Sequence, residues 1–235
     1  MGERRFYRMH VRGFDDALGP GVPEGHVVLL VGPPGTMKSS LAYHVLYENA
    51  KRDGVRGAYV TLEQGRESLE FQMARMGMPL AAVGEKLRVE DLARIRLGLE
   101  PDPGEGEKPW LDVLQRHLEG LKDSAKLQLL ALDSLPVLEI IGGVKEKRVR
   151  LFRFFGWLRG LGVTTLLVSE ATHDPNLVRD EEFLADGVIS LTMEKVGDLD
   201  VYRRIRCVKM RGVAHDTNVY TLEFDASGFR ATQAI

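Results

Sequence analysis

The stretch VVLLVGPPGTMKSSLAYHVL, residues 27–46, joins an apolar run to a glycine-rich turn and then to a helical pattern. In this order the three parts form a phosphate-binding loop, in which backbone N–H groups converge on an anion at the N-terminus of a helix. The usual pattern is Gly, four residues, Gly, Lys and then Ser or Thr. Gly32, Lys38 and Ser39 fit this pattern, and Met37 stands where the second glycine belongs. The stretch therefore predicts a nucleotide site with one altered position.

Two side chains of the loop have defined tasks in such a site. The Lys38 ammonium reaches the β- and γ-phosphates, and the Ser39 hydroxyl ligates Mg²⁺. The alternative is an ordinary glycine turn with a solvated lysine, and the order of strand, turn and helix favours the phosphate site. If position 37 needs a left-handed backbone, a residue with a Cβ costs roughly 1–2 kcal/mol there. The N–H of Met37 survives the change, so we expect nucleotide binding to persist.

Two acidic residues, Asp133 and Glu63, stand at the ends of apolar strand patterns. Ligands of open α/β sheets bind at the carboxyl ends of the strands. Asp133 is expected to hold the Mg²⁺ hydration shell, although an aspartate in this position is as often a helix cap. Glu63 is expected to orient or deprotonate the water that attacks the γ-phosphate. For Glu63, spacing alone leaves the cap as an equal alternative.

Apolar runs and helical patterns alternate along most of the chain. Strands are expected at residues 26–32, 56–63, 86–91, 127–134 and 163–170, and helices at 39–54, 65–77, 110–123 and 145–162. Three strand patterns at 186–195, 202–212 and 218–228 follow, and we expect them to be antiparallel. The order predicts an α/β fold with a mostly parallel central sheet, helices on both faces and late antiparallel strands. Residues 1–235 are long enough for one such domain.

Composition argues against several other classes of protein. The formal net charge is −2, so no global attraction to DNA or to acidic membranes is expected. The single cysteine, Cys207, rules out an intramolecular disulfide and is predicted to be a small buried hydrophobic residue. The six histidines are scattered, which argues against a zinc site. No apolar run reaches membrane-spanning length, and we expect a cytoplasmic protein.

Taken together, these motifs resemble the KaiC branch of the RecA-like P-loop superfamily. The resemblance extends over nearly the whole chain and includes VRGFDDALGPGVPEG before the loop, YVTLEQ, LLALDS, TTLLVSE, EEFLADGVISL and VKMRGVAHD. The segments GFDDALGPGVPEG and KMRG are more specific than a phosphate loop alone. The resemblance implies a RecA-like fold and ATP bound at the joints between subunits of a hexameric ring, where many members of the family hydrolyse it.

The resemblance also assigns residues by position. The phosphate loop would consist of Gly35, Thr36, Met37, Lys38, Ser39 and Ser40. Glu63 matches the catalytic glutamate, and Gln64 stands where KaiC has a second glutamate. The residues implied to line the nucleotide of the next subunit are Lys209, Met210, Arg211, His215 and Asp225. Lys38, Glu63, Lys209 and Arg211 would form the catalytic set, the last two by reaching the γ-phosphate across the joint.

One departure from KaiC limits the expected activity. Glu182 and Phe183 stand where the self-phosphorylating half of KaiC carries hydroxyl residues, so self-phosphorylation is not expected. The first hypothesis is a ring protein that binds ATP with Mg²⁺, hydrolyses it slowly and has a regulatory role with an unidentified protein partner. The alternatives are a nucleotide-dependent scaffold without useful turnover, marked by Met37 and Gln64, and a RecA-like DNA-handling ATPase. The net charge and the few aromatic residues after Glu170 argue against DNA, while the basic helix at 145–159 favours it.

The helix expected at 145–162 is apolar on more than one face. Its apolar residues are Val149, Leu151, Phe152, Phe154, Phe155, Trp157 and Leu158. A helix that only covers a sheet needs a narrower stripe. We therefore expect the surplus surface to pack on a neighbouring subunit, with a crowded core within one chain as the alternative.

Overall fold

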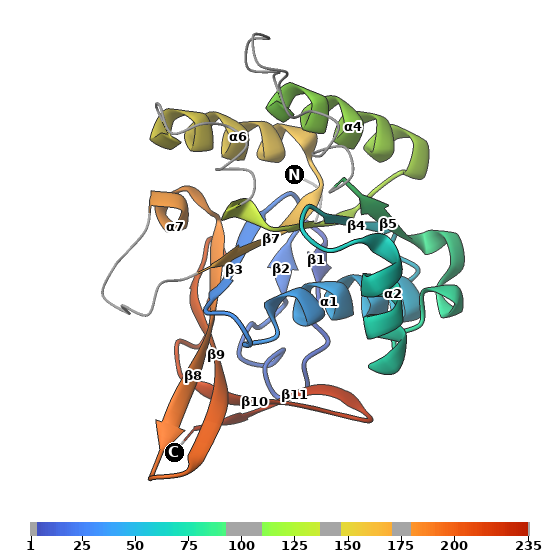
Figure 1. Cartoon of the computed structure of the whole chain (residues 1–235). Coiled ribbons are helices and arrows are strands. Elements are labelled where there is room, and N and C mark those ends of the chain that lie inside the picture. Colours follow the sequence, from blue (N-terminus) through green and yellow to red (C-terminus); the bar gives the residue numbers. More distant parts are fainter. Residues whose placement is uncertain (1–3, 93–109, 137–146, 171–179, 235) are drawn as a thin grey trace, which may run out of the picture.

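The computed structural model describes residues 4–92, 110–136, 147–170 and 180–234 (Figure 1). In chain order its elements are β1 (Phe6–Tyr7), β2 (Val22–Pro23), β3 (Val27–Gly32), α1 (Lys38–Asp53), β4 (Gly57–Thr61), α2 (Arg66–Arg75), the 3₁₀ turns η1 (Leu80–Ala82) and η2 (Gly84–Lys86), β5 (Leu87–Asp91), α4 (Trp110–Ala125), β6 (Leu129–Asp133), α6 (Lys147–Leu161), β7 (Thr164–Glu170), α7 (Asp180–Leu184), β8 (Gly187–Val196), β9 (Asp200–Met210), β10 (Tyr220–Asp225) and β11 (Gly228–Gln233). Each predicted strand and helix is present. Within these ranges no helix is both long and apolar enough to cross a membrane.

Nine strands form one sheet in the order β11-β10-β9-β8-β3-β7-β6-β4-β5. The strands from β8 to β5 are parallel, while β9, β10 and β11 follow as antiparallel neighbours. The predicted fold is confirmed, with two corrections. The strand β8 pairs in parallel with β3 and only its other edge is antiparallel. The pattern at 218–228 contains strand β10 and the turn that follows it. The next strand, β11, was not predicted from the sequence.

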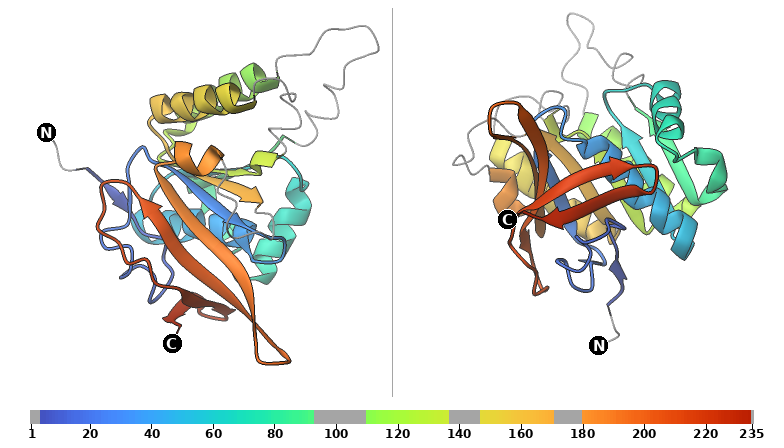
Figure 2. Two further views of the ribbon diagram at one scale, coloured as in Figure 1. Left: turned by 90° about the vertical axis from the view of Figure 1, so that its left-hand side faces the viewer. Right: turned by 90° about the horizontal axis from the view of Figure 1, so that it is seen from below.

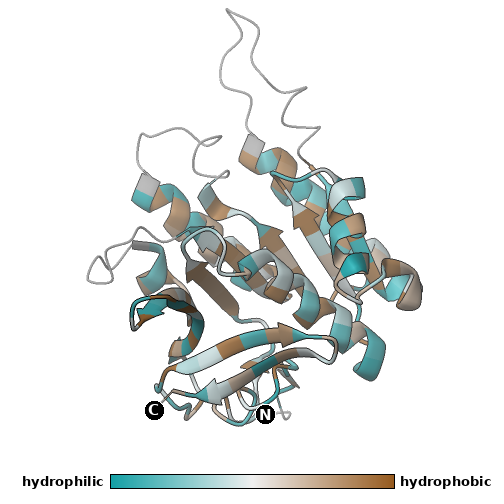
Figure 3. Cartoon of the chain, turned by 60° about the horizontal axis from the view of Figure 1, so that its bottom comes forward, coloured by the Kyte–Doolittle hydropathy of each residue, from teal (hydrophilic) through white to brown (hydrophobic). Residues whose placement is uncertain are grey.

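Helices cover both faces of the parallel part of the sheet (Figure 1). Side chains alternate across β3, so that Leu30 packs on the side of α1 and α2 while Leu29 packs on the side of α4 and α6. Hydropathy colouring shows the consequence, because the central strands are hydrophobic and the helices carry both kinds of residue (Figure 3). Cys207 is fully buried in this core, as predicted.

Helix α1 is buried on more sides than its pattern predicted. Leu41, Ala42, Val45 and Leu46 are buried as expected, but Tyr43, His44, Tyr47 and Asn49 are buried too. For His44 and Asn49 the reason is the N-terminal segment, which crosses the outer side of the helix. His44 Nε2 donates to the His10 carbonyl at 3.0 Å, and Asn49 Nδ2 donates to the Arg8 carbonyl at 2.8 Å.

The apolar faces of α6 divide between core and surface. Four of the predicted interface residues are buried, namely Leu151, Phe154, Phe155 and Leu158. Phe152 is 65% exposed and Val149 is 44% exposed. Packing within one chain therefore accounts for most of the apolar residues of α6. Val149 and Phe152 remain exposed on its surface.

The hairpin of β8 and β9 projects beyond the body of the molecule (Figure 1 and Figure 2). Its tip, residues 192–203, is exposed throughout and includes Leu199 with an exposed fraction of 92%. The base of the same hairpin pairs with β3, the strand that leads into the phosphate loop.

Candidate active site

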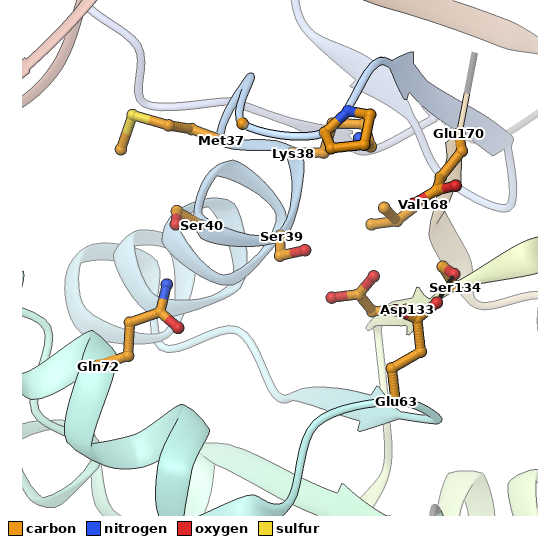
Figure 4. A pocket seen from close by; sticks show the side chains of 12 residues that line it. Met37, Lys38, Ser39, Ser40, Glu63, Gln72, Asp133, Ser134, Val168 and Glu170 are labelled. Carbon is orange, nitrogen blue, oxygen red and sulfur yellow. Dashed lines mark hydrogen bonds between the residues drawn. The ribbon is translucent and has the colours of Figure 1, made fainter. Parts of the chain in front are cut away.

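A cavity of about 320 Å³ opens at the carboxyl edge of the parallel sheet (Figure 4). The loop after β3 and the ends of β4, β6 and β7 surround it. Its lining residues are Pro34, Gly35, Met37, Lys38, Ser39, Ser40, Glu63, Gln72, Asp133, Ser134, Val168 and Glu170. Residues predicted from three separate parts of the sequence thus meet in one place.

The loop between β3 and α1 is closely held. A Cβ on Gly32 would lie 2.2 Å from the Leu191 carbonyl oxygen of β8, so only glycine fits there. Thr36 Oγ1 donates to the Pro33 carbonyl at 2.8 Å, and Lys38 Nζ donates to the same carbonyl at 3.0 Å. Helix α1 begins at Lys38, so the N–H groups of its first turn face the cavity from the helix N-terminus.

Met37 adopts the conformation that a glycine would favour. It precedes α1 with φ 71° and ψ 27°, which is left-handed. Its side chain is partly buried against the core on the α1 side of the sheet. In Figure 4 this side chain points away from Asp133 and Glu63. The side chain therefore leaves the acidic end of the cavity open.

Asp133, Ser39 and Tyr59 lie together at the inner end of the cavity. The Tyr59 hydroxyl donates to Asp133 Oδ2, and the Ser39 hydroxyl lies near both groups. Burial raises the pKa of Asp133, although the hydrogen bond from Tyr59 and the nearby Ser39 hydroxyl oppose this effect. Ser39 and Asp133 face each other in Figure 4.

Glu63 lies just after β4, beside the end of β6. The hydroxyl of Ser134 donates to Glu63 Oε1, and Ser134 itself is buried. Gln64 does not take part in this contact. Its amide donates to Ser68 Oγ at 2.8 Å and to Gln72 Oε1 at 3.3 Å, both on α2.

The cavity combines one ammonium group, which suits an anion, with several carboxylates, which suit a hard cation. Burial lowers the pKa of Lys38, while the nearby carboxylates of Glu170, Asp133 and Glu63 act in the opposite direction. Hydroxyl and carboxylate oxygens are ligands that Mg²⁺ prefers. Among the described residues no group of three or more His, Cys, Asp and Glu side chains could hold a metal alone. An ion beside Ser39 and Asp133 would therefore need phosphate oxygens and water to complete its shell, which is the usual Mg²⁺–nucleotide arrangement.

Lys209 and Arg211 lie outside this cavity. Lys209 Nζ donates to the carbonyls of Glu182 at 3.1 Å and Ala185 at 2.7 Å, at the end of α7. Arg211 Nη1 donates to Asp186 Oδ1 at 3.0 Å. Both side chains point toward the same segment, residues 182–186, although Arg211 lies just after the end of β9.

The other three residues assigned by resemblance to the next subunit's nucleotide do not line the cavity either. Met210 is buried, and its N–H donates to His215 Nε2 at 3.1 Å. Asp225 is exposed at the end of β10, where it accepts a hydrogen bond of 2.7 Å from the N–H of Ser227. The predicted residues therefore divide into those around the cavity and those outside it, with Lys209, Met210, Arg211 and His215 at or after the end of β9 and Asp225 at the end of β10.

Sequence reasoning missed several residues of the site. Glu170 ends β7 and could have been found by the rule that found Asp133. Tyr59 and Ser134 gave no signal, because a tyrosine in an apolar strand and a serine after it fit an ordinary core. Arg203 of β9 was also missed, and its Nε donates to the Gly35 carbonyl at 3.1 Å, which ties the hairpin to the loop.

The phosphate loop after the central strand β3, together with acidic residues at the ends of its neighbours, defines a RecA-like P-loop nucleotide-binding protein. The chain belongs to the KaiC ATPase family, whose model, described as "ATPase: KaiC", matches residues 7–233. It is thus an ATP-binding protein of that family.

Known relatives agree with this assignment. A UPF0273 protein of Aeropyrum pernix is 31% identical over 235 residues, covering 93% of this chain and 90% of its own length. The circadian clock protein KaiC2 of Synechocystis is 28% identical over 93% of this chain, which spans only 38% of that protein. The crystal structure of a KaiC-like protein from Pyrococcus horikoshii superposes with a TM-score of 0.81 at 27% identity, covering 98% of this chain and 100% of that one.

Proposed function

We propose that residues 1–235 form one domain that hydrolyses ATP slowly with Mg²⁺. The observation that carries the proposal is the meeting of Lys38 and Ser39, at the start of α1, with Asp133 and Glu63 across one cavity. A phosphate chain bound by the loop would place its terminal group between the lysine and the carboxylates.

The loop residues bind the triphosphate. Backbone N–H groups from Gly35 to Ser40 and the Lys38 ammonium hold the phosphates. Ser39 and Asp133 hold Mg²⁺, the second through water. When bound, the ion neutralises negative charge that develops on the phosphate oxygens.

Glu63 is the residue that acts on the attacking water. Its carboxylate accepts the water's proton or orients the water toward the γ-phosphate. Ser134 restrains one carboxylate oxygen and leaves the other available. Gln64 can only hydrogen-bond, so a single carboxylate serves this step, and we expect slow turnover.

The second set of residues serves a neighbouring subunit. Lys209 and Arg211 bind the γ-phosphate held by the next chain, and Met210, His215 and Asp225 line the same nucleotide. The family resemblance supports this arrangement, and so does the fact that none of the five lines the cavity of its own chain. A ring of identical chains with ATP at each joint would respond to nucleotide as a whole, which suits a regulatory role with a protein partner.

The test separates binding from turnover. Steady-state ATPase rates and nucleotide titrations are measured for wild type, Asp133→Asn and Glu63→Gln. We expect Glu63→Gln to lose turnover by about 100-fold or more while keeping its affinity, and Asp133→Asn to lose Mg²⁺-dependent binding as well. Glu67→Gln, an exposed change on α2, is the matched control and should leave both unchanged. Unchanged turnover in Glu63→Gln would remove that residue from the mechanism.

A nucleotide-dependent scaffold is the second candidate. Two features favour it. Met37 replaces the usual glycine of the phosphate loop, and Gln64, which replaces a second glutamate, bonds α2 instead of facing the nucleotide site. In the same experiment a scaffold would bind ATP with Mg²⁺ but show no turnover above that of Glu63→Gln.

The DNA-handling alternative rests on α6, where Arg148, Arg150 and Arg153 are exposed. The segment after Glu170 that argued against it lies outside the described residues. Binding to duplex and single-stranded DNA, measured against salt concentration, tests this alternative directly.

A further inference from the structure

Tyr59 is a buried tyrosine that the proposed mechanism has not used. It lies in β4 with no exposed surface, among core residues on the α1 side of the sheet. Its ring packs beside that of Tyr43 on α1, with centroids 5.7 Å apart. Its hydroxyl, however, does not end in the core. It donates to Asp133, one of the two residues assigned above to the Mg²⁺ end of the site.

Sheet register explains how the hydroxyl reaches the carboxylate. Strands β4 and β6 are parallel neighbours, with Tyr59 beside Ala131 and Thr61 beside Asp133. Side chains two apart on a strand share a face, so Asp133 projects on the same face as Ala131, which belongs to the core cluster around α1. Tyr59 starts two residues below the carboxylate and extends along this face toward the edge of the sheet. Its length brings the phenol oxygen to Asp133 Oδ2.

We propose that Tyr59 is a positioning residue for the bound Mg²⁺, because its hydroxyl fixes the Asp133 carboxylate in the orientation that faces Ser39. This inference rests on the proposed function, in which Ser39 and Asp133 hold the ion. Tyr59 does not touch the nucleotide in this proposal. It acts on Mg²⁺ only through Asp133, to which it is hydrogen-bonded.

The physical reason lies in the demands of the ion and of the carboxylate. Mg²⁺ requires near-octahedral geometry, so a carboxylate that rotates freely is a poor partner for its water shell. A hydrogen bond from outside the shell fixes such a ligand, and losing a bond of this kind typically costs about 10–100-fold in metal affinity. Asp133 is partly buried, and the inner oxygen of a carboxylate in such a place also needs a donor.

A purely structural role is the competing explanation, in which the hydroxyl bonds Asp133 only because it is buried. The neighbouring Tyr43 argues against it. The Tyr43 hydroxyl is buried and has no hydrogen-bond partner within the described part of the chain. The core therefore accommodates a tyrosine hydroxyl without pairing it, and burial alone does not account for the bond from Tyr59 to Asp133.

The two tyrosines supply the experiment and its matched control. Tyr59→Phe and Tyr43→Phe each remove one buried oxygen from adjacent rings of the same core. The affinity of a fluorescent ADP analogue is measured for each protein with saturating Mg²⁺ and with excess EDTA. The ratio of the two affinities is the gain due to Mg²⁺, and it does not depend on catalysis.

We expect Tyr59→Phe to reduce this gain by about tenfold or more, with the EDTA affinity unchanged. Tyr43→Phe should retain the wild-type value of both. In the Asp133→Asn background, Tyr59→Phe should change the gain by no more than about twofold, because the residue through which it acts is already altered.

Three results would overturn the proposal. The first is an unchanged Mg²⁺ gain in Tyr59→Phe. The second is an equal reduction in both backgrounds, which would show that Tyr59 does not act through Asp133. The third is a loss of EDTA affinity in Tyr59→Phe, which would give it a general role in holding the site together. If the wild type itself gains nothing from Mg²⁺, the proposed function fails instead, and this outcome is distinct from the other three.

Discussion

Met37 occupies a backbone conformation that favours glycine, and its side chain offsets part of the strain. A left-handed residue with a Cβ costs roughly 1–2 kcal/mol. Partial burial of the methionine against the core contributes in the opposite direction and is of similar size, about 1 kcal/mol or more. The restricted backbone and the packed side chain of Met37 together reduce the conformational freedom of the loop. The backbone N–H of Met37 is kept, but the loop has less freedom to open.

We therefore expect Met37→Gly to release nucleotide faster than wild type, with affinity kept within about tenfold, or roughly 1.4 kcal/mol. Stopped-flow release of a fluorescent ATP analogue measures this. Met37→Leu retains both the Cβ and an apolar side chain, and should release nucleotide at the wild-type rate. Equal rates in wild type and Met37→Gly would contradict the role given to Met37. Binding by Met37→Gly alone would mean that the native loop is degenerate.

At the scale of elements, the burial of α1 on nearly all sides places an ionisable side chain in the core. His44 is 3% exposed, packs edge-on against Phe229 with ring centroids 5.0 Å apart and donates to the His10 carbonyl. Burial lowers the pKa of His44 below its ordinary value, although the hydrogen bond to His10 opposes this shift. In the pH range between the two pKa values, the unfolded chain therefore binds more protons at this residue than the folded chain does.

The sign of the effect follows from this difference. Stability contributed by neutral His44 is complete above the ordinary pKa of about 6.5 and is lost as the pH falls below it toward the lowered value. We expect the free energy of unfolding to fall between pH 7.5 and 5.5, and to fall less in His44→Gln. Urea unfolding at the two pH values measures both slopes. Every other titrating group is common to the two proteins, so equal slopes would show that His44 does not contribute.

At the scale of the whole molecule, part of α6 is an exposed apolar surface. Phe152 is its largest exposed residue, at 65%. We expect sedimentation to show a ring in the presence of ATP, and Phe152→Ser to shift it toward smaller species. Phe71→Ser on α2, which replaces a phenylalanine that is 71% exposed, is the matched control and should leave assembly unchanged. A protein that is monomeric with and without ATP would defeat the ring.

The second prediction at this scale concerns the joint between subunits. If Arg211 serves the neighbouring chain, mixing Arg211→Ala chains with Glu63→Gln chains restores part of the hydrolysis, because some joints then combine an intact Glu63 with an intact Arg211. Positive charge supplied across an interface can contribute ~10³-fold or more in related reactions. Mixing Arg211→Ala chains with chains carrying both changes creates no intact joint and is the control. No recovery in verified mixed rings would place Arg211 within its own chain, where it pairs with Asp186.

The sequence by itself determined the phosphate loop, the order of strands and helices and the acidic strand ends. These features are local, because a loop pattern, a period of two or 3.6 residues and a carboxylate at a strand terminus can each be read within about 20 residues. Lys38, Ser39, Asp133 and Glu63 were predicted in this way, and the structure gathers all four around one cavity. Their roles there remain proposals.

Only the tertiary structure decided which distant residues became neighbours. The parallel pairing of β8 with β3, the cover that the N-terminal segment places on α1, and the bond from Tyr59 to Asp133 all join parts of the chain that local patterns do not relate. The positions of Tyr59 and Asp133 in the sequence differ by 74 residues. The register of two parallel strands, which depends on the packing of the whole sheet, brings them together, and no motif in either strand records it.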